Sequence, residues 1–255
     1  MKKIIILLVV LGLVGGILFY FGVFDKETEI TTKELVKERL EIEKELRNLA
    51  LSQPYIVSIK TMDAENISLQ TGFAVDRRGY ILTAAHGNFR FAKEITIIFQ
   101  DGKYMPARFV DEIQTLDAVL LAVDKPFDFS APPFADFLQI AMEQKYSFDK
   151  NSYMMDEKDP NRFLVLRCTN KDGSLKLERI LIGEFFEWNK AKGRLEVQQL
   201  QQDAYGCSGA PFINKNGEIM GMIRTVTGNI ISGFDAPTLD ESVKLLIKED
   251  IKKQS

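Results

Sequence analysis

The pattern of apolar and polar residues divides the chain into three regions. The first is an uninterrupted apolar run of 21 residues, Ile4 to Phe24, which as a helix spans about 31 Å, the thickness of a bilayer core. No small-residue cleavage site follows it, which favours a retained anchor over a removed signal peptide. Lys2 and Lys3 before the run predict a cytoplasmic N-terminus and an exported body. We therefore expect a single-pass membrane anchor over residues 1–27. Removal as a signal peptide is the alternative, and it leaves the compartment unchanged.

The second region, residues 28–53, has a helical period. Leu35, Ile42 and Leu49 recur every seven residues among charged residues, which predicts an amphipathic stalk helix that ends before Pro54. Two repeats are a weak indication of a coiled coil. Packing against the rest of the protein is therefore the favoured interpretation, with a coiled-coil stalk as the alternative.

The third region has the period of short β-strands separated by turn signals. The expected strands of a first set lie at residues 55–60, 71–76, 79–85, 94–100, 104–110 and 117–123. Those of a second set lie at residues 162–169, 175–188, 194–201, 210–226 and 229–236. The turn signals are Arg78-Gly79, Asp101-Gly102, Asp111-Glu112 and Asn216-Gly217, the last of which marks a hairpin. The sequence therefore predicts an all-β body made of two antiparallel units, each a barrel or a sandwich.

Two segments depart from this strand pattern. Residues 125–160 are irregular and suit a crossover between the two units, although residues 134–144 could form a helical turn. Residues 238–252 place Thr238 and Glu241 at the spacing of a capping box, which predicts a closing helix. Its apolar face comprises Val243, Leu246, Ile247 and Ile251. This helix is expected to dock on the body.

Composition restricts the function classes. A formal net charge of −3 without a dense basic block argues against nucleic acid as the main partner and leaves peptides or proteins. The single histidine excludes a multi-histidine metal site. The two cysteines, Cys168 and Cys207, lack the spacing of a metal site and are too few for a disulfide-stapled small domain. We expect neither a metal nor an organic cofactor.

Three residues carry the chemistry of nucleophilic catalysis. His86 ends a strand pair, Asp117 precedes a buried strand, and Ser208 lies between glycines in "GCSG". A serine hydroxyl attacks at neutral pH when an imidazole takes its proton, and an acid on the other ring nitrogen orients that imidazole. Small residues around the serine let the N–H groups of Gly206 and Ser208 converge on an oxyanion. Each residue alone fits an ordinary turn or surface position, but their joint occurrence predicts a catalytic site.

Three blocks, "TGFAVDRRGYILTAAH", "LDAVLLAV" and "GCSGAPFINKNGEIMGMIRTV", resemble the signature segments of trypsin-like serine peptidases, most closely the bacterial high-temperature-requirement type. The resemblance covers about residues 50–250 and implies the chymotrypsin double-barrel fold. The barrels are then expected over residues 54–130 and 131–255. The implied roles are general base for His86, orienting acid for Asp117, nucleophile for Ser208, and oxyanion donors for Gly206 and Ser208. The implied activity is peptide-bond hydrolysis through an acyl-enzyme.

The resemblance also implies a primary specificity pocket. By position, Gln202 lies at its base, with Arg224, Thr225 and Val226 along its wall. The absence of an acidic residue at the base disfavours cleavage after Lys or Arg. Val226 narrows the pocket and favours small or medium aliphatic side chains, whereas Arg224 offers an alternative attraction for an acidic one.

The chain departs from the family in several places. Cys207 precedes the nucleophile where Asn or Asp is usual, and Ala210 replaces a second glycine. The resemblance brings Cys168 near Cys207, so the two either form a disulfide that holds the oxyanion loop or remain separate buried thiols. No peptide-binding PDZ domain is expected after the closing helix, and the sequence leaves the oligomeric state open.

The favoured hypothesis is a membrane-anchored, exported serine endopeptidase. A catalytically inactive peptidase-fold binding module is the first alternative, and the intact set of three residues argues against it. A purely structural exported β protein is the second.

Overall fold

The computed structural model describes residues 36–63, 66–135, 148–149, 152–153, 163–169, 177, 179–189, 192–199, 206–227 and 230–254. The chain divides into two compact units, Met1–Lys44 and Glu45–Ser255. The anchor predicted over residues 1–27 lies outside the described residues. Among the described residues, no helix is both long enough and apolar enough to cross a membrane.

A helix over residues 36–52 confirms the helical period of the stalk. The last two turns of this helix, which belong to the second unit, contain Leu46 and Ala50, and both side chains are buried. The buried Arg167 guanidinium donates hydrogen bonds of 3.3 Å to the carbonyl oxygens of Ala50 and Leu51. These carbonyls belong to the last turn of the helix, where no partner within the helix remains. The end of the helix therefore packs against the body, as predicted.

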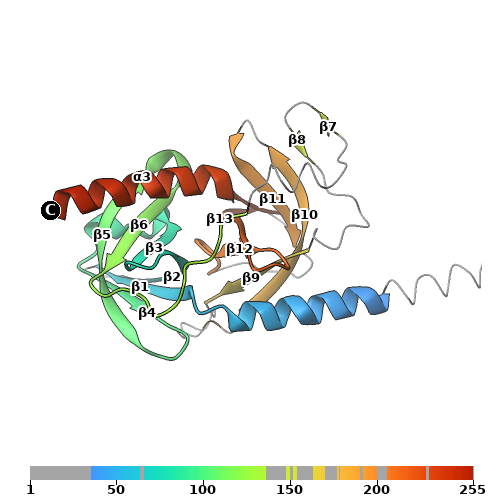
Figure 1. The fold of residues 1–255 in the computed structure, drawn as a ribbon, viewed down its shortest axis with the longest axis horizontal. Coiled ribbons are helices and arrows are strands. Elements are labelled where there is room, and N and C mark those ends of the chain that lie inside the picture. The colour runs from blue at the N-terminus through green and yellow to red at the C-terminus, as the bar shows by residue number, and fades with distance from the viewer. Residues whose placement is uncertain are drawn as a thin grey trace, which may run out of the picture. The chain divides into compact units, whose positions relative to one another are not determined.

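Six antiparallel strands close the first barrel (Figure 1). In barrel order they are β1 (Ile56–Met62), β2 (Ile67–Asp76), β3 (Tyr80–Ala84), β6 (Ala118–Val123), β5 (Tyr104–Ile113) and β4 (Glu94–Ile98). Pairing of β4 with β1 closes the ring. Ile59, Phe73 and Leu82 are fully buried, because alternate side chains of each strand point into the barrel. All six strands predicted for this set are present.

One turn signal in this barrel was wrong. Asp111 and Glu112 lie inside β5, whose register against β6 shifts between Phe109 and Asp111. A β-bulge of this kind admits an extra residue and bends the strand without ending it. The pair of acidic residues is therefore part of the strand rather than a connection.

The second barrel is built from β9 (Phe163–Cys168), β10 (Arg179–Asn189), β11 (Arg194–Gln199), β12 (Pro211–Ile213), β13 (Ile219–Thr227) and β14 (Ile230–Asp235). Their order is β11-β14-β13-β12-β9-β10, and pairing of β10 with β11 closes it. A short hairpin of β7 (Phe148–Asp149) and β8 (Ser152–Tyr153) extends the sheet from β10, within the segment expected to be irregular. Most of the predicted helical turn at 134–144 lies outside the described residues. The predicted pair of antiparallel barrels is confirmed.

The closing helix, α3 (Ala236–Gln254), begins two residues earlier than predicted. The Asp235 carboxylate accepts a hydrogen bond of 2.9 Å from the N–H of Thr238, which is the arrangement of an N-cap. Thr238 therefore lies inside the first turn rather than at the cap. Asp235 also accepts a 2.6 Å hydrogen bond from the Trp188 indole, so its position is set by the second barrel. The buried face comprises Ala236, Leu239, Val243, Ile247 and Asp250, whereas the predicted Ile251 is exposed.

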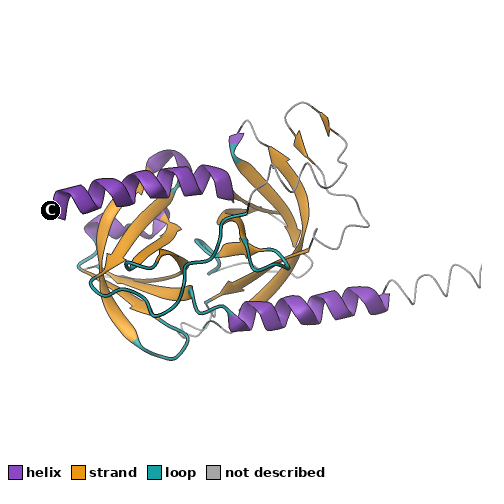
Figure 2. Cartoon of the chain, in the orientation of Figure 1, coloured by secondary structure: helices purple, strands orange, loops and turns teal. Residues whose placement is uncertain are grey.

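The far end of α3 is held by the first barrel. Asp250 accepts hydrogen bonds from the Tyr80 hydroxyl at 2.8 Å and from the Arg108 guanidinium at 2.6 and 3.0 Å. The Arg108 hydrogen bonds hold the pKa of Asp250 below its ordinary value, with the Tyr80 hydroxyl contributing in the same direction. Figure 2 shows α3 in purple extending along the strands of both barrels. The helix therefore fastens the two barrels to each other.

Replacing Asp250→Asn tests this attachment. Because the pKa of Asp250 is lowered in the folded state, its charge stabilises the fold above about pH 4, and this is lost as the pH falls through the folded pKa. Urea unfolding at pH 7 should show a loss of about 1–2 kcal/mol, modest because the Arg108 side chain is 41% exposed. The difference in unfolding free energy between Asp250→Asn and the wild type should shrink below about pH 4. Glu241→Gln, on the exposed face of the same helix, is the control. An equal loss in both variants would contradict the assignment.

Candidate active site

His86 and Asp117 meet at one edge of the first barrel. Strands β3 and β6 are antiparallel, with Ala84 opposite Ala118, so the residues after β3 and before β6 lie side by side. The His86 Nδ1 lies 2.9 Å from the Asp117 Oδ2. The Asp117 carbonyl also accepts the N–H of Ala85 at 2.8 Å. The carboxylate therefore selects the imidazole tautomer that is protonated on Nδ1 and leaves Nε2 as a proton acceptor.

Left-handed backbone positions occur at Asp117 and two residues after His86. Asp117 has φ +44° at the end of the 3-10 turn η3 (Gln114–Leu116), and Asn88 has φ +57° at the end of η1 (Ala85–Gly87), which contains His86. Such angles are unfavourable for most L residues, and Asn and Asp adopt them most readily. Backbone strain of this kind is concentrated at functional sites. Here it turns the chain sharply where the two polar side chains must face each other.

Ser208 lies in a loop of residues 206–210 that contacts the same edge. Gly206 and Gly209 both have φ +80°, which explains the two glycines of "GCSG". A side chain at Gly209 would collide with the Thr83 hydroxyl and with the backbone of Ala84. The loop therefore packs directly on the end of β3, which leads into His86. Among the described residues no hydrogen bond joins the Ser208 and His86 side chains, and such bonds are often long in free enzymes.

Thr71 of β2 fixes the backbone of this loop. Its N–H donates to the Ser208 carbonyl at 3.2 Å, and its hydroxyl donates to the Gly206 carbonyl at 3.0 Å. Thr169, just after β9, donates its own hydroxyl to the Gly206 carbonyl at 2.9 Å. The N–H of Thr169 donates in turn to the Thr71 hydroxyl at 3.1 Å. Two hydroxyls, one from each barrel, thus hold the peptide that precedes Cys207.

A hydrogen bond within the loop orients one of the two predicted oxyanion donors. The Cys207 carbonyl accepts the N–H of Ala210 at 2.8 Å inside the loop. The N–H and C=O of a trans peptide point in opposite directions, so the Ser208 N–H faces away from that bond. The Gly206 N–H belongs to a peptide shared with residue 205, which lies outside the described residues. The structure therefore accounts for the direction of the Ser208 donor alone.

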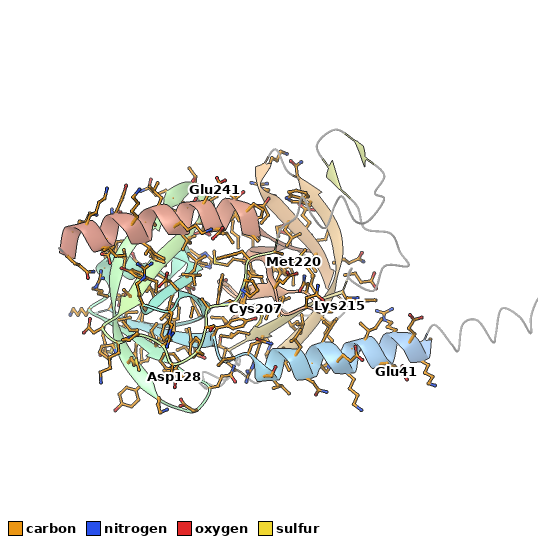
Figure 3. The ribbon with its side chains drawn as sticks, viewed as in Figure 1. Glu41, Asp128, Cys207, Lys215, Met220 and Glu241 are labelled. Atoms are coloured by element: carbon orange, nitrogen blue, oxygen red, sulfur yellow. A yellow bond between two sulfur atoms is a disulfide. The ribbon has the colours of Figure 1, made fainter. Side chains whose placement is uncertain are left out.

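Cys168 and Cys207 form a disulfide with a Cα–Cα separation of 4.8 Å. This confirms the bridged alternative of the sequence analysis. Both residues are fully buried, and Figure 3 labels Cys207 in the interior of the ribbon. The bridge ties the Ser208 loop to the end of β9, and it leaves Cys207 without a thiol that could act as a nucleophile. The Arg179 guanidinium, whose pKa is lowered by burial, lies 3.6 Å from the Cys207 Sγ.

The sequence analysis missed the polar residues that support the site. They are Gln70, Thr71, Thr83 and Thr169, all buried. With its amide oriented to satisfy both partners, Gln70 donates to the Ala84 carbonyl and accepts from the Gly87 N–H, each at 3.1 Å, on either side of His86. The sequence did contain a signal for such residues, because polar side chains that are buried in a barrel need hydrogen-bond partners. The partners themselves have no local pattern in the sequence.

The predicted specificity residues are only partly described. Gln202 lies outside the described residues, and Thr225 and Val226 are exposed on β13. Arg224 lies at a bulge of β13, where the register against β14 shifts between Ile223 and Thr225. Its Nε lies 3.6 Å from the Asp117 Oδ2. The pocket thus remains a prediction, whereas the structure brings Arg224 to the His86–Asp117 pair.

Two cavities flank His86, whose side chain is 43% exposed. One of about 370 Å³ is lined by Arg90, Phe109 and Glu112 among others. The other, of about 150 Å³, is lined by polar side chains: Thr61, Asp63, Asn66 and Ser68. The imidazole is therefore accessible from two sides.

Residues 70–222, more than half of the chain, match the trypsin-like peptidase domain. The chain belongs to this family. The structure also resembles the crystal structure of the serine endoprotease from Yersinia pestis, with a TM-score of 0.59 and 18% sequence identity over 79% of this chain and 66% of that one. At this identity the likeness concerns the fold, and the chain spans about 66% of that protein. No curated protein sequence matches the chain.

Thr71→Val tests whether the hydroxyl network positions Ser208, the nucleophile predicted from the sequence. Valine keeps the shape and the N–H but leaves the Gly206 carbonyl with one hydroxyl donor instead of two. The rate at which a fluorophosphonate labels Ser208 should fall by about tenfold, less than the roughly 10²–10³-fold cost of deleting an oxyanion donor. Thr96→Val, which removes a hydroxyl bonded to Glu94 on β4, is the control. Equal labelling rates in the two variants would refute the role given to Thr71.

Proposed function

We propose that the protein is a serine endopeptidase that hydrolyses peptide bonds through an acyl-enzyme on Ser208. The observation that carries the proposal is the 2.9 Å contact between His86 Nδ1 and Asp117 Oδ2. It lies beside the glycine-framed Ser208 loop, in a chain of the trypsin-like peptidase family. Together these features support a hydrolase rather than a binding module.

The proposed reaction uses each residue in a distinct role. The Ser208 Oγ attacks the substrate carbonyl carbon while the His86 Nε2 takes the hydroxyl proton. Asp117 stabilises the resulting imidazolium through Nδ1, and the N–H groups of Gly206 and Ser208 stabilise the oxyanion. The imidazolium then protonates the departing amine, which leaves an ester on Ser208. Water, deprotonated by His86, hydrolyses that ester and restores the serine.

The proposed substrate is a peptide or protein with a small or medium aliphatic residue before the scissile bond. This preference rests on the positions of Gln202, Thr225 and Val226 in the family resemblance. The cavities beside His86 provide room for further substrate side chains. Profiling cleavage of a peptide library tests the preference, and dominant cleavage after Lys or Arg would contradict it.

We also propose that residues 1–27 anchor the enzyme in a membrane with its body on the exported side. The apolar run with two preceding lysines supports this topology. The disulfide supports an oxidising compartment, since such bonds persist mainly outside the cytosol.

A fluorophosphonate probe tests the catalytic proposal directly. Wild-type protein should gain one probe adduct on Ser208, measured by mass spectrometry, and Ser208→Ala should gain none. His86→Ala and Asp117→Ala should each lower peptide turnover by about 10⁴-fold while leaving the fold intact, because the three residues act as a unit. Ser52→Ala, an exposed serine at the end of the stalk helix, is the labelling control. Full activity in His86→Ala would refute the mechanism, because the chain has no second histidine.

The topology proposal predicts a protein that keeps its N-terminus and sediments with membranes. Protease added from the exported side should digest the body but not the anchor. N-terminal sequencing of the membrane fraction measures retention. A soluble product that begins near residue 25 would instead indicate a removed signal peptide.

A further inference from the structure

Arg224 of β13, in the second barrel, contacts Asp117 of the first barrel. Its Nε is buried from solvent and has no hydrogen-bond partner among the described residues. The Asp117 Oδ2, 3.6 Å away, is the carboxylate oxygen with which it forms an ion pair. The rest of the guanidinium lies 5.7 Å from the Phe234 ring centroid, close enough for a cation–π contact. The bulge in β13 at Arg224 gives the side chain this direction, since bulges re-aim side chains beside active sites.

We propose that Arg224 is a positioning residue that orients the Asp117 carboxylate toward His86 and, by its charge, keeps the imidazole neutral to lower pH than Asp117 alone would allow. This inference rests on the proposed triad. It adds a residue that shifts the pH range in which His86 can accept a proton. It also gives Arg224 a role different from the pocket wall expected from the sequence.

Arg224 and His86 face the same carboxylate oxygen. The His86 Nδ1 lies 2.9 Å and the Arg224 Nε 3.6 Å from the same oxygen, Asp117 Oδ2. The His86 contact is a hydrogen bond, whereas the Arg224 contact is an ion pair too long for one, so the guanidinium acts on the carboxylate through its charge. The carboxylate charge that would stabilise an imidazolium is at the same time partly neutralised.

Other charged residues also line the cavities beside His86 and contribute to the electrostatic potential at its imidazole. Arg90 and Glu112 line the larger cavity beside it, and Asp63 lines the smaller one. The two carboxylates favour a protonated imidazole and Arg90 disfavours it. Within the part of the chain that the structure describes, Arg224 and His86 are the basic side chains that pair with Asp117. The effect of Arg224 is thus expected to exceed that of Arg90.

The single histidine makes a direct measurement feasible. NMR of the full chain, isotope-labelled at histidine, gives one imidazole signal, which reports the protonation of His86 without any requirement for activity. In Arg224→Gln the titration midpoint should rise by about 0.5–1 pH unit relative to wild type, a shift reduced by the 40% exposure of Arg224. Arg224→Lys keeps the charge and should stay within about 0.3 pH unit of wild type. Arg90→Gln is the matched control and should shift by less than half as much as Arg224→Gln.

The outcomes separate this inference from the proposed function. If Arg224→Gln is unstable by thermal melting, Arg224→Met keeps the packing on Phe234 and replaces it in the titration. An unchanged midpoint, or an equal shift in Arg90→Gln, overturns the role of Arg224 whether or not the protein is active. Failure of the wild type to react with a fluorophosphonate refutes the peptidase proposal, and the titration still decides on Arg224. If both hold, the acidic limb of the labelling rate in Arg224→Gln moves to higher pH by the same amount as the midpoint.

Discussion

The hydrogen bonds of Thr71 are the constraint on which the candidate site depends. His86 and Asp117 belong to one closed barrel and Ser208 to another, so their relative position is set by contacts between barrels. Thr71 donates its N–H and its hydroxyl to the Ser208 loop, accepts the Thr169 N–H on that hydroxyl, and accepts the Thr83 hydroxyl on its carbonyl at 2.7 Å. Thr71, Thr83 and Thr169 are buried, and leaving a buried polar group unpaired is costly. The loop is therefore held in one arrangement.

Two other attachments support this arrangement, one within the second barrel and one between the two barrels. The disulfide joins the Ser208 loop to the end of β9. Helix α3 begins at Asp235, which is bonded to Trp188 in the second barrel, and ends near Asp250, which is bonded to Tyr80 and Arg108 in the first. Both aspartates accept charge-assisted hydrogen bonds, which are stronger than neutral ones. The disulfide thus supports the Ser208 loop, and the two ends of α3 hold the barrels together around the candidate site.

The site combines these rigid supports with an unusual local charge balance. Asp117 faces both an imidazole and a guanidinium, while Glu112 and Asp63 lie on the walls of the cavities around His86. Electrostatic interactions are stronger where solvent is partly excluded, so the positions of these charges determine the local potential at His86. The hydrogen bonds that hold the Ser208 loop and the charges that face His86 and Asp117 therefore come largely from different residues.

The sequence by itself determined the strands of the two barrels and the three residues of the candidate triad. Strand periodicity is a local property, and the residue types that nucleophilic catalysis needs can be recognised in the sequence. It also favoured docking of both helices. Only the tertiary structure decided that Asp111-Glu112 is a bulge, that Asp235 rather than Thr238 caps α3, that the cysteines are bridged, and that Arg224 faces Asp117. The Thr71–Gly206 bond joins residues 135 positions apart. Such bonds depend on how two closed barrels pack against each other, and the periodicity of the sequence does not predict that packing.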